Sequence, residues 1–504
     1  MEVPLVKRIR PVVMLVLLAL VATACGARVS DEQVAEVRSG GGGASQGTGG
    51  DSTGNGDGLA VGEGGGSTSA GAVGGGAATA GGGEAGGGEA TTGGDAGGGA
   101  TGGGGGGDGG DGGGQAAAPP PPDGGNGGAT DVGVTETEMV LGNVSTLSGP
   151  VPGLFQGAVI GSQAVVAYQN SLGGMFGRKF KLDVRDDQLD TGQNRSHTID
   201  LTKKAFAFIG SFSLFDDAAV EQIKASGMPD ITYSLNSARR GLPNNFSVEP
   251  APPRGAPTGG FNYFKKKFPG AIKAVGTIYT ELAKGSHEDY KKAAESVGYD
   301  YAYERAIQAT ETDFTADIVS MRQRGVKFVF LVAVDEKTTA RIAKAMNQQS
   351  FKPEVFMVHG AAYHPGLVPL AGAAVEGMFN AQPYSMFAGE DAAHIPEVKL
   401  FNEWVQKVKP GYKPDLFAAF AWSSGRLFFQ ALEKAGPKAT RADVVNALKT
   451  IDDFSANGML APAGPASKRP PVCYIVTQVK GGKFQRVDSP PPGYRCDDGK
   501  YLIL

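Results

Sequence analysis

The sequence has few cysteines and no strongly basic segment. Three cysteines stand among 504 residues, so at most one disulfide can form within the chain and one cysteine is left over. The formal net charge is -4, and no cluster of Lys and Arg is interleaved with aromatic residues. Because nucleic-acid binding needs such a basic surface, we expect no nucleic-acid partner.

Motifs that carry catalysis are also missing. The sequence has no GxxxxGK[ST] phosphate loop, no HExxH, no CxxC and no glycine fingerprint at the first predicted helix. The segment 421–425, Ala-Trp-Ser-Ser-Gly, is similar to a nucleophile elbow, but it stands in a helical pattern and not at a strand-to-helix turn. His359 and His364 are five residues apart, a spacing that is not typical of metal ligands. We therefore expect no enzyme, no cofactor and no metal.

The segment from Gly40 to Thr130 lacks aromatic residues and holds 44 of the 80 glycines. It contains one leucine and two valines, too little apolar surface to offset the entropy of ordering the chain. It also carries nine acidic residues and no basic one, so the rest of the chain is near neutral. We predict a Gly-rich disordered linker over residues 26–130, followed by a folded part large enough for two lobes.

Residues 1–25 have the pattern of an export signal, with a basic start, an apolar run over Pro11–Val21 and small residues up to Cys25. The run is too short to span a bilayer comfortably, although a permanent anchor helix is the alternative. Residues 22–25 resemble the lipobox of bacterial lipoproteins, which more often has leucine in place of Ala22. This resemblance implies that Cys25 is lipidated. Cys473 and Cys496 would then pair in an oxidising compartment.

The rest of the chain alternates short apolar runs with amphipathic stretches, which predicts parallel sheets covered by helices. The predicted strands are Met139–Val144, Phe180–Val184, Ala205–Ile209, Pro229–Thr232, Ile272–Ile278, Tyr299–Tyr303, Lys327–Val332, Glu354–Val358, Tyr474–Val479 and Phe484–Val487. The predicted helices include Phe155–Leu172, Glu288–Val297, Asp313–Arg324, Glu336–Gln349, Glu397–Lys409, Leu416–Ala435 and Arg441–Leu448. Four prolines within residues 250–257 mark a stiff crossing between two lobes. We expect lobe 1 over residues 131–257, completed by about 386–460, and lobe 2 over 258–385, completed by about 461–504.

Hydroxyl-rich segments follow three predicted strands of the first lobe, at residues 145–148, 211–213 and 232–237. In open parallel sheets, ligands lie beyond the carboxyl ends of the strands. Helix N-termini at these places offer free N–H groups and a partial positive charge, which suits a carboxylate. Each hydroxyl could instead only cap the helix that follows it. Three such segments together favour a ligand site.

Six short motifs occur in a fixed order: Leu147-Ser-Gly-Pro150, Gly173-Gly-Met-Phe-Gly-Arg178, Asp186-Asp187, Phe208-Ile-Gly-Ser211, Asp313-Phe314 and Val375-Glu-Gly-Met378. In this order the chain resembles the leucine/isoleucine/valine-type periplasmic binding proteins over about residues 138–487. The resemblance implies an α/β fold of periplasmic binding protein type I. It has two Rossmann-like lobes, with parallel sheets flanked by helices, joined by a multi-strand hinge of three strands. The lobes would close on a small solute and deliver it to an ABC permease.

Carried over by position, the family's contacts fall on both lobes. They fall on Ser148, Phe155, Ser213, Ser234 and Asn236 in the first lobe, and on Tyr279, Lys284, Asp335 and His359 in the second. Amino-acid binders of this family have an aromatic residue where Lys284 stands and an acid in the segment that begins at His359. The ammonium end of an amino acid therefore lacks a partner, unless Asp335 or Glu336 supplies it. The solute class stays open among amino acids, amides and small carboxylates.

The sequence thus predicts a monomeric, extracytoplasmic solute-binding lipoprotein of an ABC importer, anchored to the cell membrane by an N-terminal lipid. Its partners would be a small-molecule ligand and the ABC permease. A ligand-sensing receptor subunit without transport is the first alternative. An exported hydrolase with Ser423 as its nucleophile is the second.

Overall fold

The computed structural model describes residues 119–120, 123–149, 153, 155–308 and 311–504. The predicted signal peptide, Cys25 and most of the predicted linker lie outside these residues. Within the described ranges, no helix is both long and apolar enough to cross a membrane. The fold is α/β, with two mainly parallel sheets flanked by helices.

The first sheet consists of four parallel strands in the order β2-β1-β3-β4. These strands are β1 (Glu138–Ser145), β2 (Lys179–Asp186), β3 (Ala207–Ile209) and β4 (Asp230–Ile231). Alternate residues of β1 belong to different apolar clusters. Met139 and Leu141 pack in the main core, whereas Val140 and Val144 pack with Leu201 of a flanking helix. Both faces of the sheet are therefore covered, as parallel sheets require.

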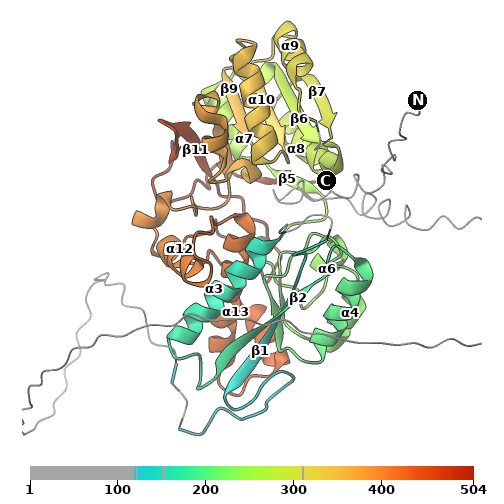
Figure 1. The fold of residues 1–504 in the computed structure, drawn as a ribbon, viewed down its shortest axis with the longest axis vertical. Coiled ribbons are helices and arrows are strands. Elements are labelled where there is room, and N and C mark those ends of the chain that lie inside the picture. Colours follow the sequence, from blue (N-terminus) through green and yellow to red (C-terminus); the bar gives the residue numbers. More distant parts are fainter. Residues whose placement is uncertain (1–118, 121–122, 150–152, 154, 309–310) are drawn as a thin grey trace, which may run out of the picture. The chain divides into compact units, whose positions relative to one another are not determined.

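Helices from distant parts of the sequence cover this first sheet. They are α3 (Gln156–Ser171), α4 (Thr191–Thr202), α5 (Val220–Ser226), α6 (Ser237–Arg240), α12 (Pro396–Val408), α13 (Leu416–Ala435) and α14 (Arg441–Leu448). Figure 1 shows α3 beside α13, with α4 on the other side of β1 and β2. The contact between α3 and α13 is close because Gly161 meets the backbone of Ala418 and Gly425 meets Val165. The later helices thus complete the first lobe.

The second sheet has seven strands in the order β12-β11-β10-β9-β8-β6-β7. Their bounds are β6 (Val275–Thr280), β7 (Tyr301–Ile307), β8 (Phe328–Val332), β9 (Val355–Val358), β10 (Phe379–Gln382), β11 (Ile475–Lys480) and β12 (Lys483–Arg486). The strands from β6 to β10 pair in parallel, while β11 and β12 are antiparallel. Strand β8 is wholly buried because its alternate residues face two clusters, as Phe328 and Val329 show.

The helices of the second lobe lie on both faces of this sheet. They are α7 (Gly259–Lys267), α8 (Lys284–Ser296), α9 (Thr315–Gln323), α10 (Glu336–Gln348) and α11 (Leu367–Ala371). Short 3-10 turns lie between neighbouring elements: η2 (Ala271–Lys273), η3 (Glu281–Ala283), η4 (Gly360–Ala362), η5 (Gly372–Val375) and, before α12, η6 (Glu390–Ala393). Phe261 and Phe264 of α7 pack on the face of β8 that carries Phe330 and Phe328.

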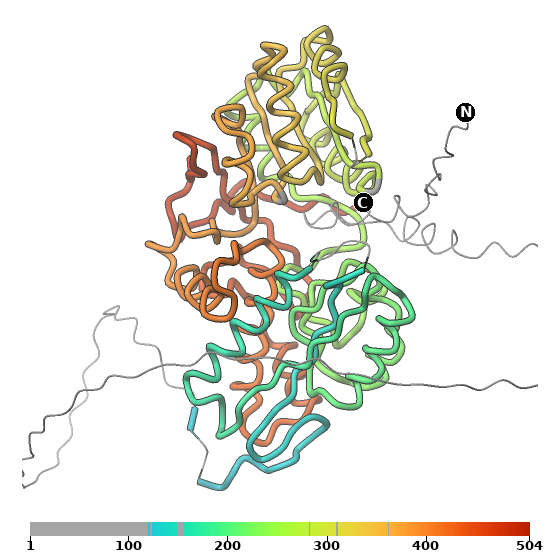
Figure 2. The backbone as a smooth tube through the Cα atoms, in the orientation of Figure 1, coloured from blue at the N-terminus to red at the C-terminus, as the bar shows by residue number. Residues whose placement is uncertain are grey.

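The chain crosses between the two sheets three times (Figure 2). The first crossing contains β5 (Gly255–Pro257), which pairs with the C-terminal strand β13 (Tyr501–Ile503). The second follows β10, and its Tyr384 forms a bridge with Leu460 of the third. The third crossing leads into β11. The predicted disulfide is present in the structure, and it joins Cys473 of the third crossing to Cys496 of the C-terminal segment.

Several elements differ from the sequence-based prediction. Helices α4 and α7 and strand β10 were not predicted. Only four of the twelve residues of α4 are buried, so this helix carries little apolar periodicity. Residues before Asp131 also belong to the fold, because the Asn126 side chain donates hydrogen bonds to the carbonyls of Glu136 and Phe176. The folded part thus includes residues before Asp131.

Candidate functional site

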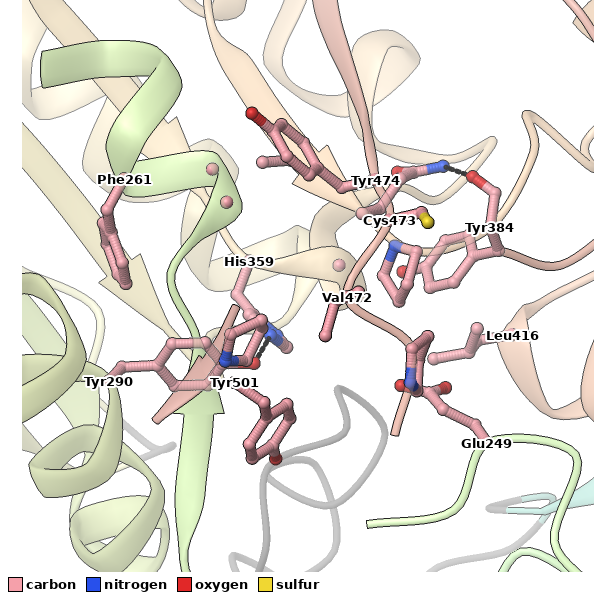
Figure 3. Close-up of a pocket in the computed structure, with 18 of the residues that line it drawn as sticks. Glu249, Phe261, Tyr290, His359, Tyr384, Leu416, Val472, Cys473, Tyr474 and Tyr501 are labelled. Carbon is pink, nitrogen blue, oxygen red and sulfur yellow. Dashed lines mark hydrogen bonds between the residues drawn. The ribbon is translucent and has the colours of Figure 1, made fainter. Parts of the chain in front are cut away.

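A pocket lies where the three crossings come together (Figure 3). The first crossing contributes Glu249, Pro250 and Pro257, the second Gln382, Pro383 and Tyr384, and the third Pro471, Val472, Cys473 and Tyr474. Tyr233 and Leu416 line the pocket from the first lobe, and Phe330 and His359 line it from the second. A solute here would contact both lobes and every connection between them.

Aromatic side chains dominate the wall of this pocket: Tyr233, Phe261, Tyr290, Phe330, Tyr384, Tyr474 and Tyr501. The hydroxyls of Tyr290, Tyr474 and Tyr501 make hydrogen bonds within the protein. The hydroxyl of Tyr290 lies 2.5 Å from Nε2 of His359, and that of Tyr474 donates to Asp498 at 2.9 Å. The hydroxyl of Tyr501 donates to the carbonyl of Gly255 at 3.1 Å. What these three residues offer a solute is therefore mainly ring surface.

The imidazole of His359, which lines the pocket, has a lowered pKa. Desolvation lowers the pKa of its imidazole to about 4, so the ring is neutral at pH 7. One ring nitrogen meets Tyr290, and the other, Nδ1, is buried without a hydrogen-bond partner among the described residues. The buried Oε1 of Gln382 also has no partner there. Two hydrogen-bonding atoms on the wall are thus still unpartnered, which is costly in a buried place unless a solute or water binds them.

The position of His359 follows from its local sequence. It comes directly after β9 and precedes the turn η4, which begins at Gly360. A Cβ atom at Gly360 would lie 2.1 Å from the hydroxyl oxygen of Tyr384. Glycine is therefore needed here for the second lobe to approach the second crossing closely.

Two predicted ligand residues of the first lobe, Ser148 and Ser213, are bound to aspartates in the structure. The Ser148 hydroxyl donates to Asp186, and the Ser213 hydroxyl donates to Asp187. Burial alone would raise the pKa of Asp186, but hydrogen bonds from Ser148 and from backbone N–H groups outweigh it and lower the pKa. Asp187 also accepts hydrogen bonds from Thr146 at 2.7 Å and Asn194 at 3.0 Å. These aspartates hold the loops after β1 and β3, and neither serine lines the pocket.

The other first-lobe candidates have different surroundings. Ser234 is buried, and its hydroxyl has no hydrogen-bond partner among the described residues. It directly follows Tyr233, which lines the pocket. Asn236 is largely buried at the N-terminus of α6, and its side chain makes no capping bond. Phe155 is fully buried in the core, 4.9 Å from the ring of Phe417 between centroids.

Most second-lobe candidates also lie outside the pocket. The ring of Tyr279 stacks on His287 with centroids 3.8 Å apart. Lys284 is exposed at the start of α8. Asp335 caps α10 by accepting hydrogen bonds from the backbone N–H groups of two residues in its first turn. Of the nine predicted ligand residues, His359 is the one that lines this pocket.

Among the residues that line the pocket, Glu249, Tyr290, Tyr384 and Tyr501 were not predicted from the sequence. Glu249 directly precedes the proline-rich crossing, which could have drawn attention to it. The three tyrosines stand in separate elements and carry no local signal.

The structure gives Ser423 no catalytic surroundings. This residue is fully buried within α13, and its hydroxyl donates to the carbonyl of Ala419 at 2.8 Å. The sharp strand-to-helix turn of a nucleophile elbow is absent at this position. Among the described residues, no group of three or more His, Cys, Asp or Glu side chains could hold a metal ion.

Comparison with known proteins decides the family. The sequence model of the family described as periplasmic binding protein matches residues 138–483. The chain belongs to the periplasmic binding protein family. This finding confirms the resemblance deduced from the six motifs, and the fold class agrees with it.

This periplasmic binding protein is similar to one curated protein and to two solved structures as follows. The Leu/Ile/Val-binding protein homolog 1 of Brucella melitensis is 25% identical over 314 residues, which cover 60% of this chain and 80% of that protein. A branched-chain amino acid ABC transporter structure from Thermus thermophilus, with bound valine, aligns with a TM-score of 0.58 and 17% identity over 70% of this chain and 96% of that one. A fatty acid ABC transporter substrate-binding protein from Thermomonospora curvata aligns with a TM-score of 0.57 and 22% identity over 73% and 95%. At these identities the two structures show a shared fold.

Proposed function

We propose that this protein is the extracytoplasmic solute-binding subunit of an ABC importer. Membership of the periplasmic binding protein family and the names of its relatives support this proposal. The observation that carries it is the pocket, which is lined from both lobes and from all three crossings. A solute in this position could hold the two lobes together for delivery to a permease.

Solute binding can be tested on the purified full-length chain with its disulfide intact. Calorimetry and thermal unfolding against amino acids, amides, carboxylates and amines would reveal a ligand. A solute at 100 times its dissociation constant should stabilise the native state by about 2.7 kcal/mol. If no solute of this panel bound, the proposed function would be refuted.

A transport function and a sensing function lead to different expected results, although both require solute binding in the pocket. A transport subunit should be required for cellular uptake of the radiolabelled solute that calorimetry identifies. A receptor that only senses would leave uptake unchanged when its gene is deleted. Loss of uptake on deletion, and its recovery on re-expression, would support the importer.

We further propose that lipidation of Cys25 attaches the mature protein to the outer face of the membrane. The support is the lipobox-like sequence at residues 22–25 and the basic and apolar segments before it. Replacing Cys25→Ser should release the protein from the membrane fraction or leave it unprocessed. Unchanged membrane association and processing of this variant would contradict the proposal.

A further inference from the structure

Apolar side chains make up much of the pocket wall. Those that line it are Phe261, Phe330, Met357, Leu416 and Val472, and Figure 3 labels three of them. Prolines from the three crossings extend this surface: Pro250, Pro257, Pro383 and Pro471. Covering the apolar body of a solute with such a wall is favourable because it removes apolar surface from water.

The same wall offers an anion only an incomplete counter-charge. Among the described residues that line the pocket there is no lysine or arginine, and the His359 imidazole is neutral at pH 7 because desolvation lowers its pKa to about 4. The N-terminus of α7 reaches the wall at Gly259 and Gly260, but a helix N-terminus carries only about half a unit charge. A solute carboxylate would therefore lose hydration that these groups replace only in part.

A solute cation meets a different obstacle. Glu249 places a carboxylate on the wall, and this residue already takes part in an interaction within the chain. An ammonium group would have to compete for that carboxylate while losing its own hydration. A zwitterionic amino acid combines this difficulty with that of the carboxylate.

An uncharged solute avoids both costs and can still form hydrogen bonds. The neutral imidazole of His359 has one ring nitrogen, Nδ1, without a partner among the described residues. Backbone N–H groups in the first turn of a helix such as α7 can donate to a carbonyl oxygen. Hydrogen bonds between neutral groups require no charge to be buried.

We propose that the pocket binds an uncharged solute that joins an apolar or aromatic body to a neutral hydrogen-bonding group such as a carboxamide. The inference rests on the proposed solute-binding function and specifies its ligand class. Side chains such as Phe330, Leu416 and Val472 contact the apolar body. His359 and the first turn of α7 face the neutral polar group.

Three probes that share an aromatic ring and differ in charge test this assignment. Phenylacetamide is neutral, phenylacetate is an anion and phenethylamine is a cation. Calorimetry with the full-length chain at pH 7 should show phenylacetamide binding at least about tenfold more tightly than either ion, a difference of about 1.4 kcal/mol. Leucine serves as the zwitterionic comparison and should also bind more weakly than phenylacetamide.

A variant that adds a cation to the wall tests the role of charge directly. Val472 lines the pocket and is only partly buried. Val472→Lys should shift the preference toward phenylacetate by at least about tenfold relative to phenylacetamide, because the carboxylate gains a full counter-charge. Val132→Lys makes the same change at an exposed residue that does not line the pocket, and it should leave the preference unchanged. Thermal unfolding checks that both variants are folded, and the probe series on the native chain decides the assignment if Val472→Lys is not.

The outcomes separate this inference from the proposed function. A native preference for phenylacetamide, shifted toward phenylacetate in Val472→Lys and kept in Val132→Lys, supports the inference. Tighter native binding of phenylacetate, phenethylamine or leucine than of phenylacetamide overturns it and leaves the solute-binding function in place. The inference is also overturned if folded Val472→Lys keeps the native preference, or if only charged solutes of the wider panel bind. Absence of binding by every solute in that panel refutes the proposed function itself.

Discussion

His359 should make the stability of the folded chain depend on pH in a defined range. Desolvation lowers its pKa from 6.5 to about 4, so the folded state disfavours the charged ring. Between these two values the unfolded chain binds more protons than the folded chain, and stability rises with pH. The stabilisation is therefore fully present above pH 6.5 and is lost as the pH falls through about 4.

The size of the effect follows from the shift. Each pKa unit corresponds to about 1.4 kcal/mol, so the full shift would amount to about 3 kcal/mol. His287 contributes with the same sign, because burial also lowers its pKa, although Glu304 opposes that change. A comparison of variants is needed to isolate His359. His359→Gln keeps a group that can accept the hydrogen bond of Tyr290 but cannot take up a proton.

Two measurements check this prediction. Guanidinium unfolding of the native chain between pH 7.5 and pH 4.5 should show a greater loss of stability than the same series for His359→Gln. NMR titration of the five histidines should show a histidine that stays neutral at pH 5 and whose signals are missing from the spectrum of the variant. Parallel stability curves for the two proteins, or a His359 ring that titrates near 6.5, would refute the reasoning.

Three further predictions concern the fold. Arg178→Met should lower the free energy of unfolding, measured in guanidinium, by at least about 3 kcal/mol, because the Arg178 side chain donates to four backbone carbonyls at 2.7 to 2.8 Å. A loss under about 1 kcal/mol would contradict this prediction. Gly161→Ala should cost about 1 to 3 kcal/mol, because its Cβ would lie 2.2 Å from the Ala418 carbonyl oxygen, while Gly270→Ala has open space and should cost much less. In the Cys25→Ser chain, denatured without reductant, a thiol reagent should label nothing, and labelling would count against the disulfide.

The apolar elements of the fold could be predicted closely because their burial is encoded locally. Strand β8 is a continuous apolar run, and the structure places it within one residue of the predicted range. The bounds of α13 agree with the prediction at both ends. Helix α4 was missed because only four of its twelve residues are buried, so it lacks the apolar periodicity that predicts a helix, and polar contacts hold it instead. Asp190 caps its first turn, and Asn194 donates to the buried Asp187.

The residues that line the pocket were harder to predict, since a hydroxyl after a strand can serve several purposes. Ser148 and Ser213 stand where a ligand contact was expected, yet the structure binds both to neighbouring aspartates. Asp186 and Asp187 were recognised as a family landmark, but their role in holding these loops depends on three-dimensional contacts. The position of Tyr501 in the pocket could not be predicted from the sequence either, because its hydroxyl donates to the carbonyl of Gly255, 246 residues earlier in the sequence.

The connections around the pocket suggest why its position suits a protein that must respond to a solute. Strand β13 pairs with β5, so the C-terminal segment is tied to the first crossing. The disulfide ties the same segment to the third crossing, and the bridge between Tyr384 and Leu460 joins the third to the second. The three crossings therefore cannot shift independently. Since all three line the pocket, we expect a bound solute to restrain every connection between the lobes at once.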